Sequence, residues 1–200
     1  MAYLPNFPPI HFDFGAIQEL GPELEKRGIT KPLFLTDRGL VEHGVFQQVT
    51  SVLPTGQAWA VFDDIPENPT IDGVERALLV YKSEACDGVV AVGGGSVLDS
   101  GKALRVVAVQ GGDVINYLKH PEKIGVNVAP YITIPTTAGT GAEITFGGGI
   151  HPEKCKTKDK RFHVFYSVEA YQPHTMWLKR YPITSSKQRS PSKSKIVPKV

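Results

Sequence analysis

Three consecutive glycines and a serine, at positions 93–96, form the segment of this sequence that is best suited to bind an anion. They follow the continuously apolar run at 88–92 and precede residues with helical spacing, which places a turn between a buried strand and a helix. Glycine lets the backbone turn tightly and lets a phosphate approach without a Cβ in the way. The first N–H groups of the helix face such an anion, and the helix dipole favours its charge. The pattern therefore favours a phosphate site over an ordinary capped turn.

Two side chains near this turn could add to the site. Ser96 can offer its hydroxyl as a hydrogen-bond donor or cap the helix. We place Asp99 in the first helical turn, where a carboxylate suits the dipole or points toward the nicotinamide side of a bound dinucleotide. The turn is not G-x-G-x-x-G, because Leu98 replaces the last glycine, and it is not a P-loop, because Ala103 replaces the Ser or Thr that holds magnesium. The sequence therefore argues against a nucleoside triphosphatase.

A second polar loop, Thr136–Gly141, carries three hydroxyls and two glycines directly after the apolar run Tyr131–Pro135. Ligands of an open α/β sheet bind at the carboxyl ends of the strands, so this loop could hold a ribose or a pyrophosphate. A plain strand-to-helix loop is the equal alternative. Asp37 ends an earlier apolar run, where a carboxylate can accept hydrogen bonds from an adenosine ribose. A helix cap or a turn is the more ordinary role of an aspartate at that place.

The elements that must position these residues alternate along the chain. Short apolar or alternating runs predict strands at 10–15, 32–37, 59–62, 88–92 and 131–135. Helical spacing predicts helices that begin at Ala16, at Leu40, after a Thr70 cap and after the glycine turn. The second of these helices runs from Leu40 to Val52 without a break. Together these signals predict an α/β fold, a doubly wound parallel-sheet (Rossmann-like) dinucleotide-binding domain over residues 1–150.

Composition bounds the partners and the extent of this domain. The 200 residues carry a net charge of +2, which is too small to indicate nucleic acid or a membrane surface as a partner. Residues 151–200 form a basic, low-complexity tail without a recognisable domain, which we expect to be irregular, and we expect its polar segment 184–200 to be disordered. Nucleic-acid binding through this tail is the weaker alternative, because its basic runs at 153–161 and 184–200 contain no aromatic residues.

Two cysteines make no disulfide framework, and the N-terminus lacks the features of a signal peptide, so we expect a cytoplasmic protein. No apolar run is long enough to cross a membrane. The six histidines show no metal-ligand spacing, so no residue is predicted to bind a metal. No Ser-His-Asp arrangement is indicated either, and the catalytic residues stay unassigned.

Two segments together resemble signatures of the iron-containing (group III) alcohol dehydrogenases. They are 93–102, which reads GGGSVLDSGK, and 135–145, which reads PTTAGTGAEIT. The segments 63–70 and 14–16 fit the same family, and the similarity extends over about residues 10–145. The resemblance implies an N-terminal NAD-binding domain joined to a helical domain that holds the metal. It also implies a set of cofactor-lining residues: Asp37, Asn68, Gly94, Gly95, Ser96, Asp99, Thr136, Thr137 and Thr140.

The resemblance implies hydride transfer between a small alcohol or aldehyde and NAD, with Fe²⁺ or Zn²⁺ as a Lewis acid. An acidic residue at Asp37 favours NAD over NADP, because it would repel a 2′-phosphate. The metal ligands of the family have no counterpart after Thr145, so we expect a truncated or frame-shifted, incomplete copy. Apolar surface that the missing domain would otherwise cover would favour self-association, so a homo-oligomer is possible. A non-catalytic nucleotide-binding fragment and a glycerol-dehydrogenase-like enzyme are the alternatives.

Overall fold

The computed structural model describes residues 8–145, 147–151 and 175–177. These residues form a six-stranded sheet in the order β1-β6-β5-β4-β2-β3, with every neighbouring pair parallel. The strands are β1 (Ile10–His11), β2 (Pro32–Leu35), β3 (Ala60–Phe62), β4 (Gly88–Gly93), β5 (Tyr131–Pro135) and β6 (Thr175–Trp177).

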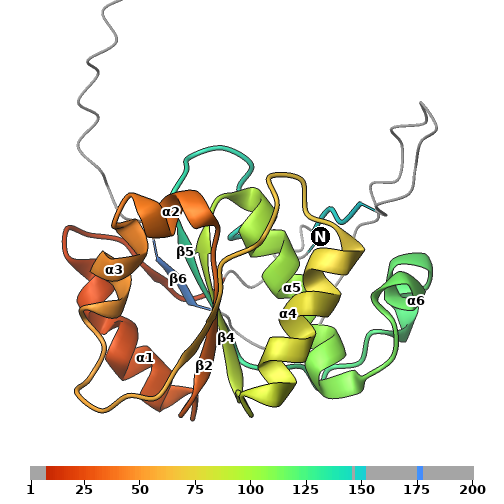
Figure 1. The fold of residues 1–200 in the computed structure, drawn as a ribbon, viewed down its shortest axis with the longest axis horizontal. Helices are drawn as coiled ribbons and strands as arrows, with labels where there is room; N and C mark the ends of the chain where they lie inside the picture. The colour runs from red at the N-terminus through yellow and green to blue at the C-terminus, as the bar shows by residue number, and fades with distance from the viewer. Residues whose placement is uncertain (1–7, 146, 152–174, 178–200) are drawn as a thin grey trace, which may run out of the picture.

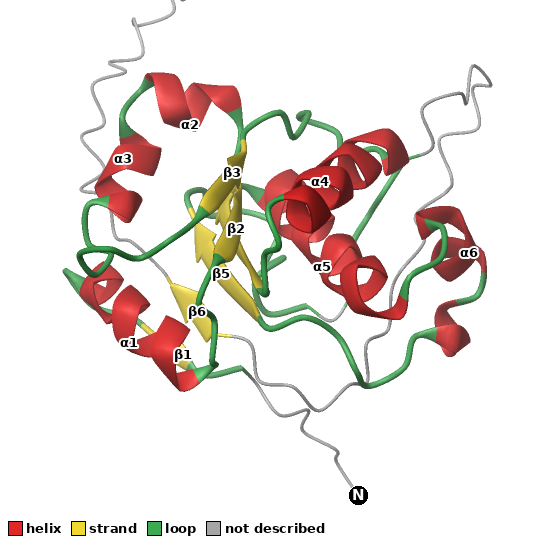
Figure 2. Cartoon of the chain, turned by 60° about the horizontal axis from the view of Figure 1, so that its bottom comes forward, coloured by secondary structure: helices red, strands yellow, loops and turns green. Residues whose placement is uncertain are grey.

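Helices cover both faces of this sheet (Figures 1 and 2). One layer contains α1 (Leu20–Lys26), α2 (Arg38–Glu42) and α3 (Val45–Thr50). The other layer contains α4 (Ile71–Ser83), α5 (Gly95–Gln110) and α6 (Val114–Lys119). Two short 3-10 helices, η1 (Ala16–Glu19) and η2 (Pro121–Lys123), complete the described elements. In the described part of the chain, no helix combines the length and the apolar character needed to span a membrane.

The central strands are buried on both faces, as a doubly wound sheet requires. In β4, Val89 and Ala91 join the hydrophobic cluster that includes residues of α4 and α5. Val90 and Val92 join the opposite cluster, which includes residues of α1 and α3. The continuously apolar run at 88–92 was thus a correct signal for a strand packed on two sides, and the doubly wound parallel sheet is confirmed.

Three elements differ from the sequence predictions. The helix predicted from Leu40 to Val52 is broken at Gly44, whose φ of 75° ends α2 and starts α3. Gly44 adopts this left-handed conformation without strain, which allows a turn inside an otherwise periodic apolar face. Helix α6 was not predicted. Strand β6 lies within the tail that was expected to be irregular, and it joins β1 to β5. The segment 184–200, predicted to be disordered, lies outside the described residues.

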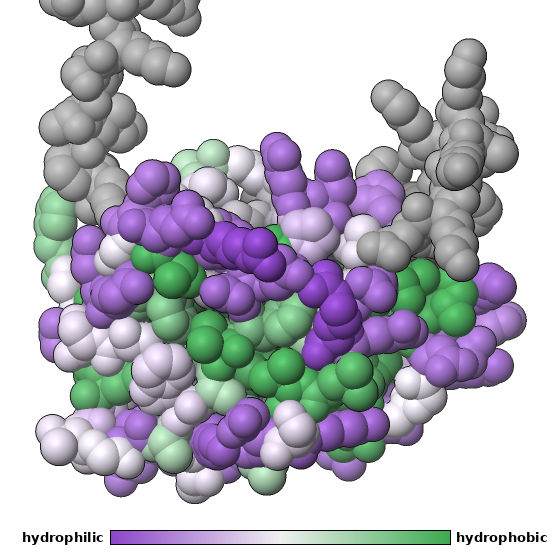
Figure 3. Space-filling view, in the orientation of Figure 1, coloured by the Kyte–Doolittle hydropathy of each residue, from purple (hydrophilic) through white to green (hydrophobic). Residues whose placement is uncertain are grey.

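The carboxyl ends of the strands lie along the upper edge of Figure 1, and the loops that follow β2, β3, β4 and β5 meet there. The chain leaves β2 toward β3 on one side and β4 toward β5 on the other, so the strand order reverses between β2 and β4. Ligands of open α/β sheets bind at such a reversal. Hydrophilic side chains gather along this upper part of the molecule, above a more hydrophobic band (Figure 3).

Candidate nucleotide site

The glycine turn lies where the sequence predicts, between β4 and α5. Gly94 is the N-cap of α5, with extended backbone and no side-chain hydrogen bond to the helix. The N–H groups of Val97 and Leu98 both donate to the Gly94 carbonyl, at 3.1 Å each. Among the described residues, no acceptor contacts the N–H groups of Gly95 and Ser96. The start of a 16-residue helix therefore keeps two donors available for an anion.

The expected roles of two side chains at this turn are corrected. Ser96 does not cap α5: it lies inside the helix, and its hydroxyl donates to the carbonyl of Glu67. Asp99 is the fifth helical residue, beyond the first turn. Its carboxylate accepts from the N–H of Gly149 at 2.9 Å and pairs with Lys102 Nζ at 3.0 Å. Both side chains therefore tie α5 to neighbouring loops rather than to its own N-terminus.

The loop after β5 packs directly against the glycine turn. The N–H of Thr136 donates to the carbonyl of Gly93 at 3.0 Å, which aligns the two strand ends. A Cβ added to Gly94 would lie 3.1 Å from Thr137 Oγ1, and one added to Gly95 would lie 2.7 Å from Thr140 Oγ1. The two loops that the sequence singled out are thus in contact, and glycine at 95 leaves room for that contact.

Asp37 lies two residues after the end of β2 and caps α2, because its Oδ1 accepts from the N–H of Leu40 at 3.0 Å. The ordinary role that the sequence allowed for Asp37 is therefore present, and a ribose contact stays a prediction. Asn68 is exposed in the loop after β3. That loop contacts the glycine turn through the Glu67 carbonyl, and Pro69 accepts from the N–H of His151 at 2.8 Å. The structure thus brings the loops after β2, β3, β4 and β5 and the start of α5, which together carry the nine predicted residues, to one edge of the sheet.

Lys102 is a residue whose role the sequence analysis did not predict. Its side chain is 6% exposed, and Nζ donates to Thr145 Oγ1 at 3.0 Å and to the Gly147 carbonyl at 2.6 Å. Burial lowers the pKa of the Lys102 ammonium, against the opposing attraction of Asp99. The spacing of three residues between Asp99 and Lys102 on a helix was the one sequence signal that could have predicted their ion pair. The partners of Lys102 at 145 and 147 are too distant in sequence to be inferred.

Asp64 is the second such residue. It forms an isolated antiparallel bridge with Asp37, so it lies beside the end of β2. Its carboxylate pairs with Arg38 at 2.8 Å and with Arg76. The hydrogen bond from Arg76, together with the charge of Arg38, holds the pKa of the Asp64 carboxyl below its usual value. The adenosine end of the expected site is thus bordered by a network of ion pairs.

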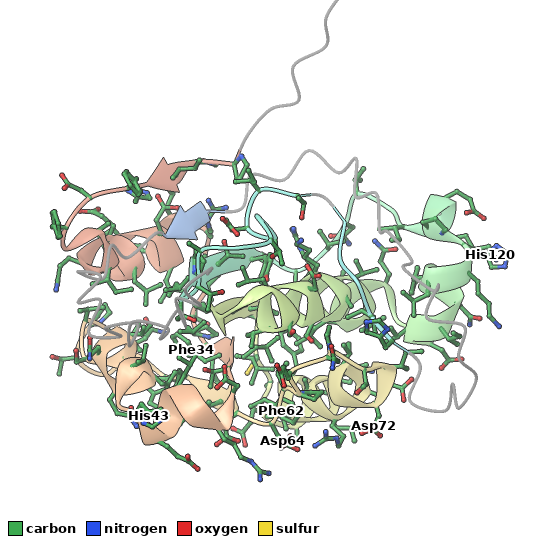
Figure 4. The ribbon with its side chains drawn as sticks, turned by 90° about the horizontal axis from the view of Figure 1, so that it is seen from above. Phe34, His43, Phe62, Asp64, Asp72 and His120 are labelled. Carbon is green, nitrogen blue, oxygen red and sulfur yellow. The ribbon has the colours of Figure 1, made fainter. Side chains whose placement is uncertain are left out.

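The described residues contain no group of three or more histidine, cysteine, aspartate or glutamate side chains that could hold a metal ion. His43 and His120 lie at opposite ends of the molecule (Figure 4). The iron or zinc that the resemblance implies therefore finds no ligand set in this part of the chain.

Comparisons with known proteins agree with this geometry. The family model of the iron-containing alcohol dehydrogenases matches residues 8–167, which extends the similarity beyond the residue 145 expected from the motifs. The chain is 41% identical over 150 residues to 4-hydroxybutyrate dehydrogenase of Cupriavidus necator, covering 74% of this chain and 39% of that protein. It is 38% identical over 152 residues to lactaldehyde reductase of Escherichia coli K12, with the same coverage of 74% and 39%.

A solved structure, the NADH-dependent butanol dehydrogenase A of Thermotoga maritima, superimposes with a TM-score of 0.78 at 30% identity. The superposition covers 89% of this chain and 44% of that chain. The chain thus spans about two fifths of the length of the curated relatives named above, each covered to 39%. With the family model matched over most of its length, the chain belongs to the iron-containing alcohol dehydrogenase family.

Proposed function

We propose that this chain forms the NAD-binding part of an NAD-dependent alcohol dehydrogenase. The observation that carries the proposal is the start of α5, where two N–H groups have no acceptor among the described residues. Donors at the positive end of a long helix suit a pyrophosphate. The solved butanol dehydrogenase that shares this fold is NADH-dependent by name, which supports the same cofactor here.

Each loop at the carboxyl edge is assigned one part of the nucleotide. The glycine turn binds the pyrophosphate, and the hydroxyls of the loop after β5 contact the adjacent phosphate or ribose. The carboxylate at the end of β2 accepts hydrogen bonds from the adenosine ribose and favours NAD over NADP. The loop after β3 closes the site beside the turn. The proposed cofactor-lining residues are Asp37, Asn68, Gly94, Gly95, Ser96, Asp99, Thr136, Thr137 and Thr140.

NAD held by these residues would supply the hydride acceptor for oxidation of an alcohol, and NADH the hydride donor for reduction of an aldehyde. This chain contributes the binding and orientation of the dinucleotide. The described residues do not fit a metal ion, and we derive no step through one. Relatives named for 4-hydroxybutyrate and lactaldehyde favour a small alcohol or aldehyde as the substrate. We infer a cytoplasmic location, because the two cysteines make no disulfide framework.

Isothermal titration of the purified chain with NAD⁺ tests the proposal. We expect one weak, saturable site, with ADP-ribose competing for it, because the contacts proposed above involve the pyrophosphate and the ribose. Absence of saturable binding, with the fold verified by circular dichroism, would contradict the proposal. A parallel assay with NAD⁺, a primary alcohol and added Fe²⁺ or Zn²⁺ separates an active dehydrogenase from a non-catalytic nucleotide-binding module. That second candidate is favoured by the lack of metal-binding groups in the described residues.

A further inference from the structure

We propose that Asp64 is a cofactor-specificity residue, which neutralises two arginines that would otherwise receive the 2′-phosphate of NADP. The proposal rests on the proposed function, because it concerns the adenosine end of the same nucleotide site. Asp37 is already assigned to contact the ribose directly. Asp64 is a second specificity residue at the same end of the site, and it acts by pairing with neighbouring arginines and not by touching the cofactor.

Asp64 is adjacent to the position expected for the adenosine ribose. It follows β3 and forms a backbone bridge with Asp37, the residue at the end of β2. The N–H of Ile65 donates to the Thr36 carbonyl at 3.4 Å, which holds the two chain segments together. In dinucleotide-binding folds, a carboxylate near this place contacts the ribose 2′-OH, whereas an arginine accommodates a 2′-phosphate.

Both oxygens of the Asp64 carboxylate are engaged by arginines. Oδ1 lies 2.8 Å from Nη2 of Arg38, and Oδ2 pairs with Nη1 of Arg76. Arg76 has further partners, since its Nε lies 2.8 Å from Asp72 Oδ2 and its guanidinium lies 5.5 Å from the centre of the Phe62 ring. Figure 4 shows Phe62, Asp64 and Asp72 gathered on one side of the molecule.

The two arginines therefore differ in how firmly they are held. When Asp64 is neutralised, Arg76 still has its ion pair with Asp72 and its contact with the Phe62 ring. Among the described residues, Arg38 has Asp64 as its ion-pair partner and no other. The Arg38 side chain is 68% exposed and belongs to the residue directly after Asp37. Loss of the Asp64 charge thus releases one mobile guanidinium beside the ribose position.

The balance of charge explains why NADP is disfavoured as the chain stands. Two carboxylates, of Asp64 and Asp72, pair with the two guanidiniums, and Asp37 and Asp63 add two more carboxylates at positions next to Asp64, by the backbone bridge and by sequence. A 2′-phosphate placed here meets net negative charge, and the charge of each arginine is already offset by a carboxylate. A free arginine binds phosphate through paired N–H groups, so Arg38 becomes the phosphate ligand once Asp64 is neutral.

The decisive variant is Asp64→Asn in the full 200-residue chain, titrated calorimetrically with NAD⁺ and with NADP⁺. We expect the ratio of the dissociation constants, NADP⁺ over NAD⁺, to fall about fivefold, the size typical of one exposed charge pair. The gain should shrink in about 0.5 M NaCl, because exposed charges are screened there. An unchanged ratio in a variant that still binds NAD⁺ would overturn the inference.

Two controls separate the release of Arg38 from a general loss of negative charge. Asp72→Asn removes the same charge but leaves the Asp64–Arg38 pair, so the ratio should stay within about twofold of the unmodified chain. Adding Arg38→Ala to Asp64→Asn should cancel the gain, and persistence of the gain would contradict the role of Arg38. If the Asn variant does not keep NAD⁺ binding, Asp64→Ser replaces it. A native chain that binds neither nucleotide refutes the proposed function itself.

Discussion

At the scale of single residues, the closest approach in the candidate site is between Gly95 and Thr140. A Cβ at position 95 would lie 2.7 Å from Thr140 Oγ1, a distance at which one of the two loops must move. Gly95→Ala should therefore displace Thr140 and weaken NAD⁺ binding about tenfold, equivalent to about 1.4 kcal/mol. Thr140 is exposed, and moving it breaks one long hydrogen bond, from the N–H of Ala142 to its Oγ1 at 3.3 Å, so the melting temperature should change little.

Gly139→Ala is the matched control, because nothing lies within 4 Å of a Cβ at that position of the same loop. Titration calorimetry and thermal unfolding of both variants check the prediction. Equal NAD⁺ affinities in the two variants would show that the contact between the loops does not shape the site.

Cys86 carries a pH dependence of stability that is independent of the site. Burial raises the pKa of its thiol from 9.0 to about 11. A raised folded-state pKa means that the thiol keeps its proton in the folded state while the unfolded chain loses it. This contribution to stability is complete below about pH 9 and is lost as the pH rises to about 11. Cys86→Ala should therefore lose less stability than the unmodified chain between pH 9 and 11.

Urea unfolding gives the free energy of unfolding of both proteins at pH 8 and at pH 11. The change between the two pH values is compared, so the constant packing cost of the smaller side chain cancels. Comparison with the unmodified chain is essential, because burial also raises the pKa of Tyr81 to about 12 and lowers that of Arg105 to about 10. Parallel pH curves for the two proteins would mean that the thiol titrates alike in the folded and unfolded states.

At the scale of elements, α5 depends on one close crossing with β5. A Cβ at Gly101 would lie 2.6 Å from Tyr131 Oη, and Tyr131 is fully buried with its hydroxyl donating to the Leu98 carbonyl at 2.7 Å. Unlike Thr140, this ring has no room to move. Gly101→Ala should destabilise the fold by about 1–3 kcal/mol through overpacking. The loss should lower the melting temperature by at least about 2 °C.

Thermal unfolding of Gly101→Ala, with Gly125→Ala as the comparison, checks this prediction. The nearest atom to a Cβ at Gly125 is Gln110 Nε2 at 3.5 Å, which is an ordinary van der Waals distance. A melting temperature equal to that of the comparison variant would show that α5 can move away from the sheet at low cost.

The elements also show what a sequence can and cannot predict here. The strand at 88–92 was predicted correctly because both of its faces are apolar. The cap at Thr70 was predicted correctly because a hydroxyl residue precedes a stretch with helical spacing, and its Oγ1 accepts from the N–H of Gly73 at 3.1 Å. The break at Gly44 was missed because a glycine permits a left-handed turn without requiring one. Apart from the Asp99–Lys102 pair, the ion pairs of Asp64 and the contacts of Lys102 join residues 12 to 45 positions apart, which no local pattern encodes.

At the scale of the whole molecule, β6 connects the first strand to the rest of the sheet. The order β1-β6-β5 places Thr175–Trp177 between β1 and β5, so β1 reaches the central sheet through a strand about 165 positions later in the chain. The domain boundary at residue 150 therefore stays a prediction, and the presence of β6 in the same sheet argues against it. Local packing explains the burial of β4 and β2, but not the attachment of β1.

A chain ending at residue 151 tests which description is correct. Without β6, the outer edge of β5 lies open and β1 has no partner among the described strands. We expect the shortened chain to unfold at least about 4 °C below the full chain, which corresponds to more than about 1 kcal/mol at this size. Amides of Ile10 and His11 should lose their protection from hydrogen exchange, while those of β4 keep theirs. A chain ending at 177 is the control and should retain both properties. Equal stability and exchange in the chains ending at 151 and 177 would instead support an independent domain over residues 1–150.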